Sequence, residues 1–135
     1  MKTLIESALS QVPAAFERLI GDLAELVAIP SVSGEAAHAD DCRRAAAWIE
    51  ARLTELPGGA VQVFQTTKNP IVYARMPAAQ AEAPTLLIYA HYDVQTAEPL
   101  GDWAHKPFEA QREGDLLFGR GTSDMKGPFL ATVAA

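Results

Sequence analysis

The apolar residues near the start of the chain recur with the period of an α-helix. They predict a helix over about residues 14–29. Proline is tolerated in a first helical turn and stops a helix elsewhere, so Pro13 suits the start and Pro30 the end. The apolar face consists of Phe16, Leu19, Ile20, Leu23, Leu26 and Val27.

A second helical pattern follows the loop 31–35 and extends to about Leu56. The hydroxyl of Ser33 is a suitable N-cap, and Glu35 suits the positive end of the helix dipole. Pro57-Gly58-Gly59 ends the pattern. The apolar stripe consists of Cys42, Ala45, Ala46, Ile49, Leu53 and Leu56, with Trp48 at its border.

The period then changes from helical to extended. Residues 61–65 and 71–75 are rich in β-formers and are joined by a short polar turn, which predicts a hairpin. Residues 76–84 form an Ala/Pro-rich connection, for which we expect an exposed loop. Residues 85–90, Thr-Leu-Leu-Ile-Tyr-Ala, are continuously apolar in their centre, which is typical of a strand buried on both faces.

The last third of the sequence predicts a hairpin and a helix. Residues 108–112 and 116–118 flank a Glu-Gly-Asp turn. A helix begins at Lys126, where Pro128 is allowed in the first turn. Helices around a sheet with a buried central strand predict an α/β layered fold. Because the sequence stops inside the last apparent helix, we expect the domain to be incomplete at its C-terminus.

The composition and charge of the chain limit the classes of function that we expect for it. Hydrophobic residues make up 49% of the chain and charged residues 21%, as in ordinary globular proteins. A net charge of −6 disfavours nucleic acid and anionic membranes as partners. The N-terminus lacks the apolar core of a secretion signal, and a single cysteine, Cys42, cannot form an internal disulfide. We therefore expect a cytoplasmic protein.

The first cluster of chemically active residues is His91-Tyr92-Asp93, directly after the apolar segment. Residues two apart on an extended chain point the same way, so His91 and Asp93 face one side. A metal-binding imidazole usually gives its second N–H to a carboxylate, and this spacing permits that pair. On this short pattern alone, a strand-end histidine beside a solvated aspartate is the more ordinary interpretation.

The second cluster is Gly119-Arg120-Gly121-Thr122-Ser123-Asp124-Met125-Lys126-Gly127, between a predicted strand and a predicted helix. A glycine-rich loop in this place can bind phosphate, but it lacks the ending of a P-loop and the spacing of a dinucleotide fingerprint. Asp124 precedes a helix start, where an anion is favoured, and an N-capping aspartate is the ordinary interpretation of this position.

Together these clusters resemble the aminoacylase/carboxypeptidase family of co-catalytic zinc hydrolases, peptidase family M20. The resemblance rests on residues 91–95, on Trp103 and Pro107-Phe108, and on residues 119–127, in this order. Residues 26–34 are similar to the family's first helix and its Pro-Ser-x-Ser-Gly loop. Within the family, residues 91–95 look most like carnosinase-type dipeptidases.

The resemblance assigns a role to three residues. His91 would bind one metal ion, Asp124 would bridge two, and Asp93 would be the catalytic-site carboxylate that supports His91. It implies two divalent ions, zinc or else cobalt or manganese. It also implies a cis peptide bond after Asp124. The family's Glu-Glu pair, a further acidic ligand and a distant histidine have no positions in these residues, so residues 1–135 correspond to an N-terminal part of the catalytic domain.

The implied function of the parent protein is hydrolysis of amide bonds in small peptides, with the fragment inactive alone. Met125, where dipeptidases often carry Asp or Asn, looks more like the deacylase branch, so an N-acyl amino-acid deacylase is the alternative. A non-catalytic fragment or pseudo-enzyme is the alternative from another class. The expected partners are a small peptide or N-acyl amino acid and, for the parent, a second copy in a homodimer.

Other polar and aromatic residues are expected to be structural. His38 and His105 lie outside the family's ligand positions, and Cys42 belongs to a core stripe, where thiols are usually inert. Trp103 and Phe108 are expected to hold the loop between the clusters, and Arg120 to pair with a carboxylate there.

Overall fold

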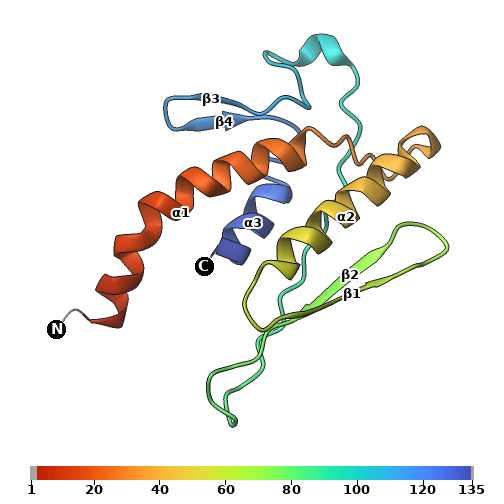
Figure 1. Ribbon diagram of the computed structural model, residues 1–135. Helices are drawn as coiled ribbons and strands as arrows, with labels where there is room; N and C mark the ends of the chain where they lie inside the picture. Colours follow the sequence, from red (N-terminus) through yellow and green to blue (C-terminus); the bar gives the residue numbers. More distant parts are fainter. Residues whose placement is uncertain (1–2, 135) are drawn as a thin grey trace.

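The computed structural model describes residues 3–134. Figure 1 shows two groups of elements joined by long connections. Helices α1 (Leu4–Val27) and α3 (Lys126–Ala134) lie against each other, with the hairpin β3–β4 beyond the C-terminal half of α1. Helix α2 (Ala39–Thr54) lies along the hairpin β1–β2. The two groups share one apolar core, in which residues of all three helices meet.

Helix α1 begins earlier than the sequence pattern predicts. The backbone N–H of Glu6 donates to the hydroxyl of Thr3 (3.2 Å), and that of Thr3 donates to the carboxylate of Glu6 (2.8 Å). This reciprocal cap starts the helix at Leu4, so Pro13 lies in its interior and the prediction of a start at Pro13 is wrong. The predicted end is confirmed to within two residues, since α1 ends at Val27.

Helix α2 buries the predicted stripe, but its start differs from the prediction. A 3₁₀ turn, η1 (Ala36–His38), precedes it, and no side chain caps either element. Ser33 is therefore not the helix cap; its hydroxyl donates to the carboxylate of Asp93 instead. The buried residues of α2 are Cys42, Ala45, Ala46, Ile49 and Leu53.

Both predicted hairpins are present. Strands β1 (Ala60–Phe64) and β2 (Ile71–Arg75) pair antiparallel in one two-stranded sheet. Strands β3 (Gln111–Glu113) and β4 (Leu116–Phe118) form the second, shorter than predicted. A second 3₁₀ turn, η2 (Leu100–Asp102), lies in the connection before β3.

The predicted strand at residues 85–90 is not formed, and this prediction is wrong for the described chain. No residue of this segment belongs to a β-ladder, and the side chains of Leu86, Leu87 and Tyr89 are more than 80% exposed. A strand buried on both faces needs paired neighbours, and none of the strands within residues 3–134 is hydrogen-bonded to this segment. The architecture is mixed α/β with two small sheets, without the single layered sheet that the sequence predicts.

Helix α3 begins at Lys126 as predicted and is followed to Ala134, while Ala135 lies outside the described residues. The core is centred where α3 meets α1, with Leu130 of α3 among the side chains of Leu23, Leu26 and Val27. Within the described chain, no helix is both long and apolar enough to cross a membrane.

Candidate metal-binding site

The structure brings the three predicted site residues together. The Nδ1 atom of His91 lies 3.0 Å from the backbone oxygen of Asp93 and 3.1 Å from its carboxylate oxygen Oδ1. On the opposite side of the ring, Nε2 lies 3.1 Å from Oδ1 of Asp124. The predicted convergence is therefore confirmed, and so is the cis peptide bond between Asp124 and Met125. The imidazole is held between two carboxylates.

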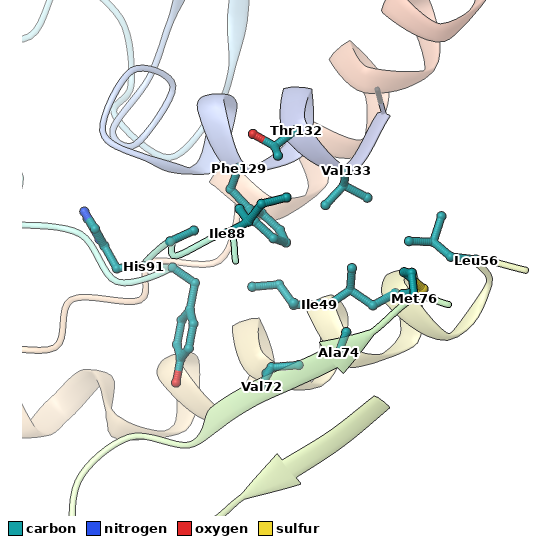
Figure 2. A pocket seen from close by; sticks show the side chains of 13 residues that line it. Ile49, Leu56, Val72, Ala74, Met76, Ile88, His91, Phe129, Thr132 and Val133 are labelled. Atoms are coloured by element: carbon teal, nitrogen blue, oxygen red, sulfur yellow. The ribbon is translucent and has the colours of Figure 1, made fainter. Parts of the chain in front are cut away.

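A cavity of about 300 Å³ lies next to the site, between α2, β2, α3 and the segment that ends at Tyr92. Most of the side chains that line it are apolar. Figure 2 shows His91 at its edge, with the ring directed away from Ile49 and Phe129. The polar site therefore lies outside this cavity, where the side chain of His91 is 39% exposed and that of Asp124 is 86% exposed.

The segment that carries His91 is attached to the loop after α1. The hydroxyl of Ser31 donates to the backbone oxygen of Tyr92 (2.7 Å), and the N–H of Val94 donates to the oxygen of Ser31 (2.9 Å). Val94 also forms a parallel bridge with Val32. Ser33 donates to the Asp93 carboxylate oxygen Oδ2, which leaves Oδ1 to His91. The Asp93 carboxylate is thus fixed from both sides.

The segment that carries Asp124 turns sharply before it enters α3. The N–H of Arg120 donates to the oxygen of Pro107, and that of Gly127 donates to the oxygen of Gly121 (3.3 Å). Gly121 has φ +94, a conformation that favours glycine. The Nζ atom of Lys126 donates to the backbone oxygens of Leu26 and Ile29, and its side chain is fully buried.

Burial and hydrogen bonding shift the pKa of several groups here. Partial burial opposes the charged form of His91, but hydrogen bonds to Asp93 and Asp124 outweigh it and raise the pKa of the ring. Burial lowers the pKa of Lys126 to about 8 and raises the pKa of Tyr92 to about 12. The negative field that favours a charged imidazole also favours a bound cation at Nε2.

The geometry around Nε2 of His91 is suitable for a shared metal ion. Nitrogen and oxygen ligands about 2.1 Å from one tetrahedral zinc ion lie about 3.4 Å apart. The Nε2 of His91 and the Oδ1 of Asp124 are 3.1 Å apart, close to that value. The Asp93 carboxylate lies within hydrogen-bonding distance of the other ring nitrogen, Nδ1, as the supporting carboxylate of a metal-bound histidine does. The donor set fits zinc.

The remaining predicted ligands have no counterpart here. Over residues 3–134, no three His, Cys, Asp or Glu side chains form a group able to hold one metal ion. Asp93 does not complete such a group because it faces Nδ1 of His91, away from Asp124. These residues thus supply two candidate ligands and one supporting carboxylate.

The other histidines lie in structural contacts. His38 pairs with Asp41 at 2.8 Å, and the ring of His105 lies 3.2 Å from Glu113 and packs against Phe118. Neither contacts the site residues, as the sequence predicts.

The loop between the two clusters is held by an aromatic residue and a cation. The indole N–H of Trp103 donates to the oxygen of Ala97 (2.9 Å), and the guanidinium of Arg120 lies over its ring at 4.8 Å. Arg120 also donates to the oxygen of Thr96 (3.0 Å). The predicted role of Trp103 in holding the loop is confirmed, while that of Phe108 stays a prediction. Arg120 pairs with a carbonyl and an aromatic ring rather than with a carboxylate.

Sequence reasoning missed three contributors to the site. Ser31 received no role, Ser33 was predicted as a helix cap, and Lys126 as a helix start. The available signal was the Ser-x-Ser spacing of Ser31 and Ser33, which places both hydroxyls on one side of an extended loop. For Lys126, the signal was a single cation at the head of an otherwise apolar helix.

The histidine between two carboxylates has the arrangement of a metal ligand with its supporting carboxylate. The model of peptidase family M20/M25/M40 matches residues 87–135, which contain all three site residues. The chain belongs to this peptidase family.

Two similar proteins are enzymes of different kinds, a dipeptidase and a desuccinylase. The chain is 34% identical over 111 residues to a cysteinylglycine-S-conjugate dipeptidase of Corynebacterium striatum, covering 82% of the chain and 24% of that protein. It is 37% identical over 116 residues to a succinyl-diaminopimelate desuccinylase of Xanthobacter autotrophicus, covering 83% of the chain and 28% of that protein. The chain thus spans about a quarter of the length of these relatives.

A solved structure shows the same fold. Human carnosine dipeptidase 1 superposes with a TM-score of 0.84 at 26% identity, over 96% of this chain and 30% of that one. The described elements are therefore arranged as in the matched part of that dipeptidase.

Proposed function

We propose that the protein functions in metal-dependent hydrolysis of amide bonds in small peptides. The observation that carries this proposal is the imidazole of His91 between two carboxylates, with Nε2 only 3.1 Å from Asp124. Support comes from the family membership and from the dipeptidase of Corynebacterium striatum, whose similarity covers 82% of the chain.

Each of the three residues has a distinct role in this proposal. His91 would hold a metal ion through Nε2, and Asp124, whose side chain is 86% exposed, would be the carboxylate ligand shared between the ions. Asp93 accepts the N–H of Nδ1 and so fixes the ring and its tautomer. Two bound divalent ions, zinc or else cobalt or manganese, would polarise the scissile carbonyl and supply a hydroxide near neutral pH.

We infer that residues 1–135 alone bind metal weakly and do not turn over substrate. Zinc in a catalytic site has about three protein ligands, whereas the described residues offer two for a pair of ions. A general base that takes a proton from water is also needed, and Asp93 is already engaged by His91 and Ser33. In this proposal, residues 1–135 are the N-terminal part of a catalytic domain, and further residues supply the remaining groups.

N-acyl amino-acid deacylation is the second candidate function. A specific observation favours it: the desuccinylase of Xanthobacter autotrophicus is 37% identical over 83% of the chain. Met125 after the bridging carboxylate is also more typical of the deacylase branch. Deacylation and dipeptide hydrolysis both cleave an amide, so the three site residues have the same roles in each.

The test uses the product of the whole reading frame that encodes these residues, loaded with zinc. It is assayed with a panel of dipeptides and a panel of N-acyl amino acids, beside a His91→Ala variant. Hydrolysis of dipeptides that is lost in His91→Ala supports the proposal, and preference for N-acyl amino acids supports the second candidate. Zinc binding at His91 without hydrolysis of either panel would contradict both and indicate a non-catalytic protein.

A further inference from the structure

The ammonium group of Lys126 is buried in an unusual place, at the C-terminal end of another helix. Its side chain is 0% exposed, and Nζ lies 2.9 Å from the backbone oxygen of Leu26 and 2.8 Å from that of Ile29. The last carbonyls of a helix have no partner within the helix and carry its negative dipole end. A buried cation needs such acceptors, so Lys126 is held against the end of α1.

Lys126 follows Asp124 by two residues, and the contact therefore restrains the position of Asp124. The turn that carries Asp124 packs closely on both neighbours. A Cβ atom built on Gly121 would lie 3.0 Å from Cδ of Lys126 and 3.0 Å from Cγ1 of Val94. The backbone at Gly121 therefore packs between Lys126 and Val94, and a side chain at this position would displace one of them.

The loop after α1 holds the second cluster as well. Ser31 bonds the backbone of Tyr92 and Val94, and Ser33 bonds the carboxylate of Asp93. Residues 26–33, here called the anchoring segment, thus contact both clusters of site residues. The two clusters are also joined directly, by the contact between His91 and Asp124 and by the bond from Arg120 to the oxygen of Thr96.

We propose that the anchoring segment is the positioning element of the metal site, with Lys126 as the positioning residue for Asp124 and Ser33 for Asp93. This rests on the proposed function, because it assumes that Nε2 of His91 and the Asp124 carboxylate share an ion. None of the proposed positioning residues binds the ion. They set the separation between two ligands that are far apart in the sequence.

The experiment measures binding of Co²⁺ and Zn²⁺ to the purified protein. The visible absorption of Co²⁺ reports the number and geometry of its ligands, and competition with a chromophoric chelator gives the affinity for Zn²⁺. The variants are Lys126→Met, which keeps the length of the side chain without its donors, and Ser33→Ala. Lys106→Met is the matched control, because Lys106 is 77% exposed and pairs with Glu109. Circular dichroism checks that each variant is folded.

We expect Lys126→Met and Ser33→Ala to lower the affinity for Zn²⁺ by about 10–100-fold and to change the Co²⁺ spectrum. Lys106→Met should do neither. Ser33→Thr, which restores a hydroxyl at an exposed position, should recover the wild-type spectrum. A residue that only stabilises the fold would lower the melting temperature and leave the spectrum of the folded protein unchanged.

The His91→Ala variant distinguishes a failure of the proposed function from a failure of the positioning role. If the wild-type protein binds no metal in a His91-dependent way, the proposed function is wrong at this site. If binding depends on His91 but is the same in folded Lys126→Met and in Ser33→Ala, the positioning role is wrong and the proposed function stands. Should Lys126→Met fail to fold, the comparison of Ser33→Ala with Ser33→Thr decides the proposal.

Discussion

The Nε2 atom of His91 lies 3.1 Å from the Oδ1 atom of Asp124, although 33 positions separate the two residues. This contact joins the segment before the long loop to the turn that starts α3. Two charged or polar groups in such a contact, exposed to solvent by 39% and 86%, add little stability as an ion pair. The contact therefore contributes little to the stability of the fold.

The first prediction concerns the two candidate ligands. His91→Ala and Asp124→Ala should each weaken Zn²⁺ binding by more than the roughly 10–100-fold that loss of a supporting partner costs, since each removes a direct ligand. Competition with a chromophoric chelator measures the effect. His105→Ala is the control, because that ring lies against Glu113 and Phe118. Equal affinities of wild type and His91→Ala would exclude His91 as a ligand.

The second prediction separates a supporting carboxylate from a ligand. Asp93→Asn keeps the size of the side chain but weakens the acceptor for Nδ1 of His91, so zinc affinity should fall by about 10–100-fold without a loss of binding. The same competition assay measures it. Asp102→Asn, at an exposed position in η2, should have no effect. Complete loss of binding in Asp93→Asn would mean that Asp93 binds the metal directly.

Much of the local structure could be predicted from the sequence because it depends on near neighbours. The stripe of Cys42, Ala45 and Ile49 is buried as its period indicates, and both hairpins form where turn residues separate β-formers. The start of α1 differs from the prediction because the cap formed by Thr3 and Glu6 starts the helix at Leu4, nine residues before Pro13. Proline is compatible with the first turn of a helix, but its presence does not mean that a helix starts there.

The segment with Leu86 and Leu87 shows where local pattern fails. Its apolar run has the composition of a central strand, yet a strand is defined by its partners, and the described chain provides none beside it. The candidate site was predicted through motif resemblance, while Lys126 and Ser33 were missed. Their contacts with Leu26 and Asp93 join residues 100 and 60 positions apart, which no local pattern encodes.

The third prediction concerns the core under the site. Leu26 is 0% exposed and lies in the cluster that joins α1 to α3. Leu26→Ala should lower the free energy of unfolding by about 2–5 kcal/mol, through lost apolar contact and the cavity left behind. Urea denaturation followed by circular dichroism measures it. Leu9→Ala in the same helix is the control, since Leu9 is 63% exposed and its change should be within about 0.5 kcal/mol.

The last prediction concerns the thiol of Cys42, the single cysteine of the chain. Burial raises its pKa, with a smaller contribution from the negative charge of Asp93, and the residue is 1% exposed. A raised pKa means less thiolate at any pH, and the thiolate is the species that reacts with disulfide reagents. At pH 8.5, where an ordinary thiol is about half ionised, the folded protein should therefore react slowly with a chromogenic disulfide.

The same protein in urea provides the control, because unfolding exposes the thiol and restores its ordinary pKa. The rate in urea should exceed the native rate by at least about tenfold, after correction for the effect of urea on a free cysteine. The raised pKa of Cys42 also determines the direction in which this residue changes the stability of the fold with pH. The unfolded thiol loses its proton at lower pH than the folded one, so the contribution of Cys42 to the free energy of unfolding should decline as pH rises above about 8.5. Because the lowered pKa of Lys126 acts in the opposite direction over this range, the measured quantity is the difference between wild type and Cys42→Ala. A native thiol that reacts as fast as the unfolded one would contradict its burial on the inner face of α2 and its raised pKa.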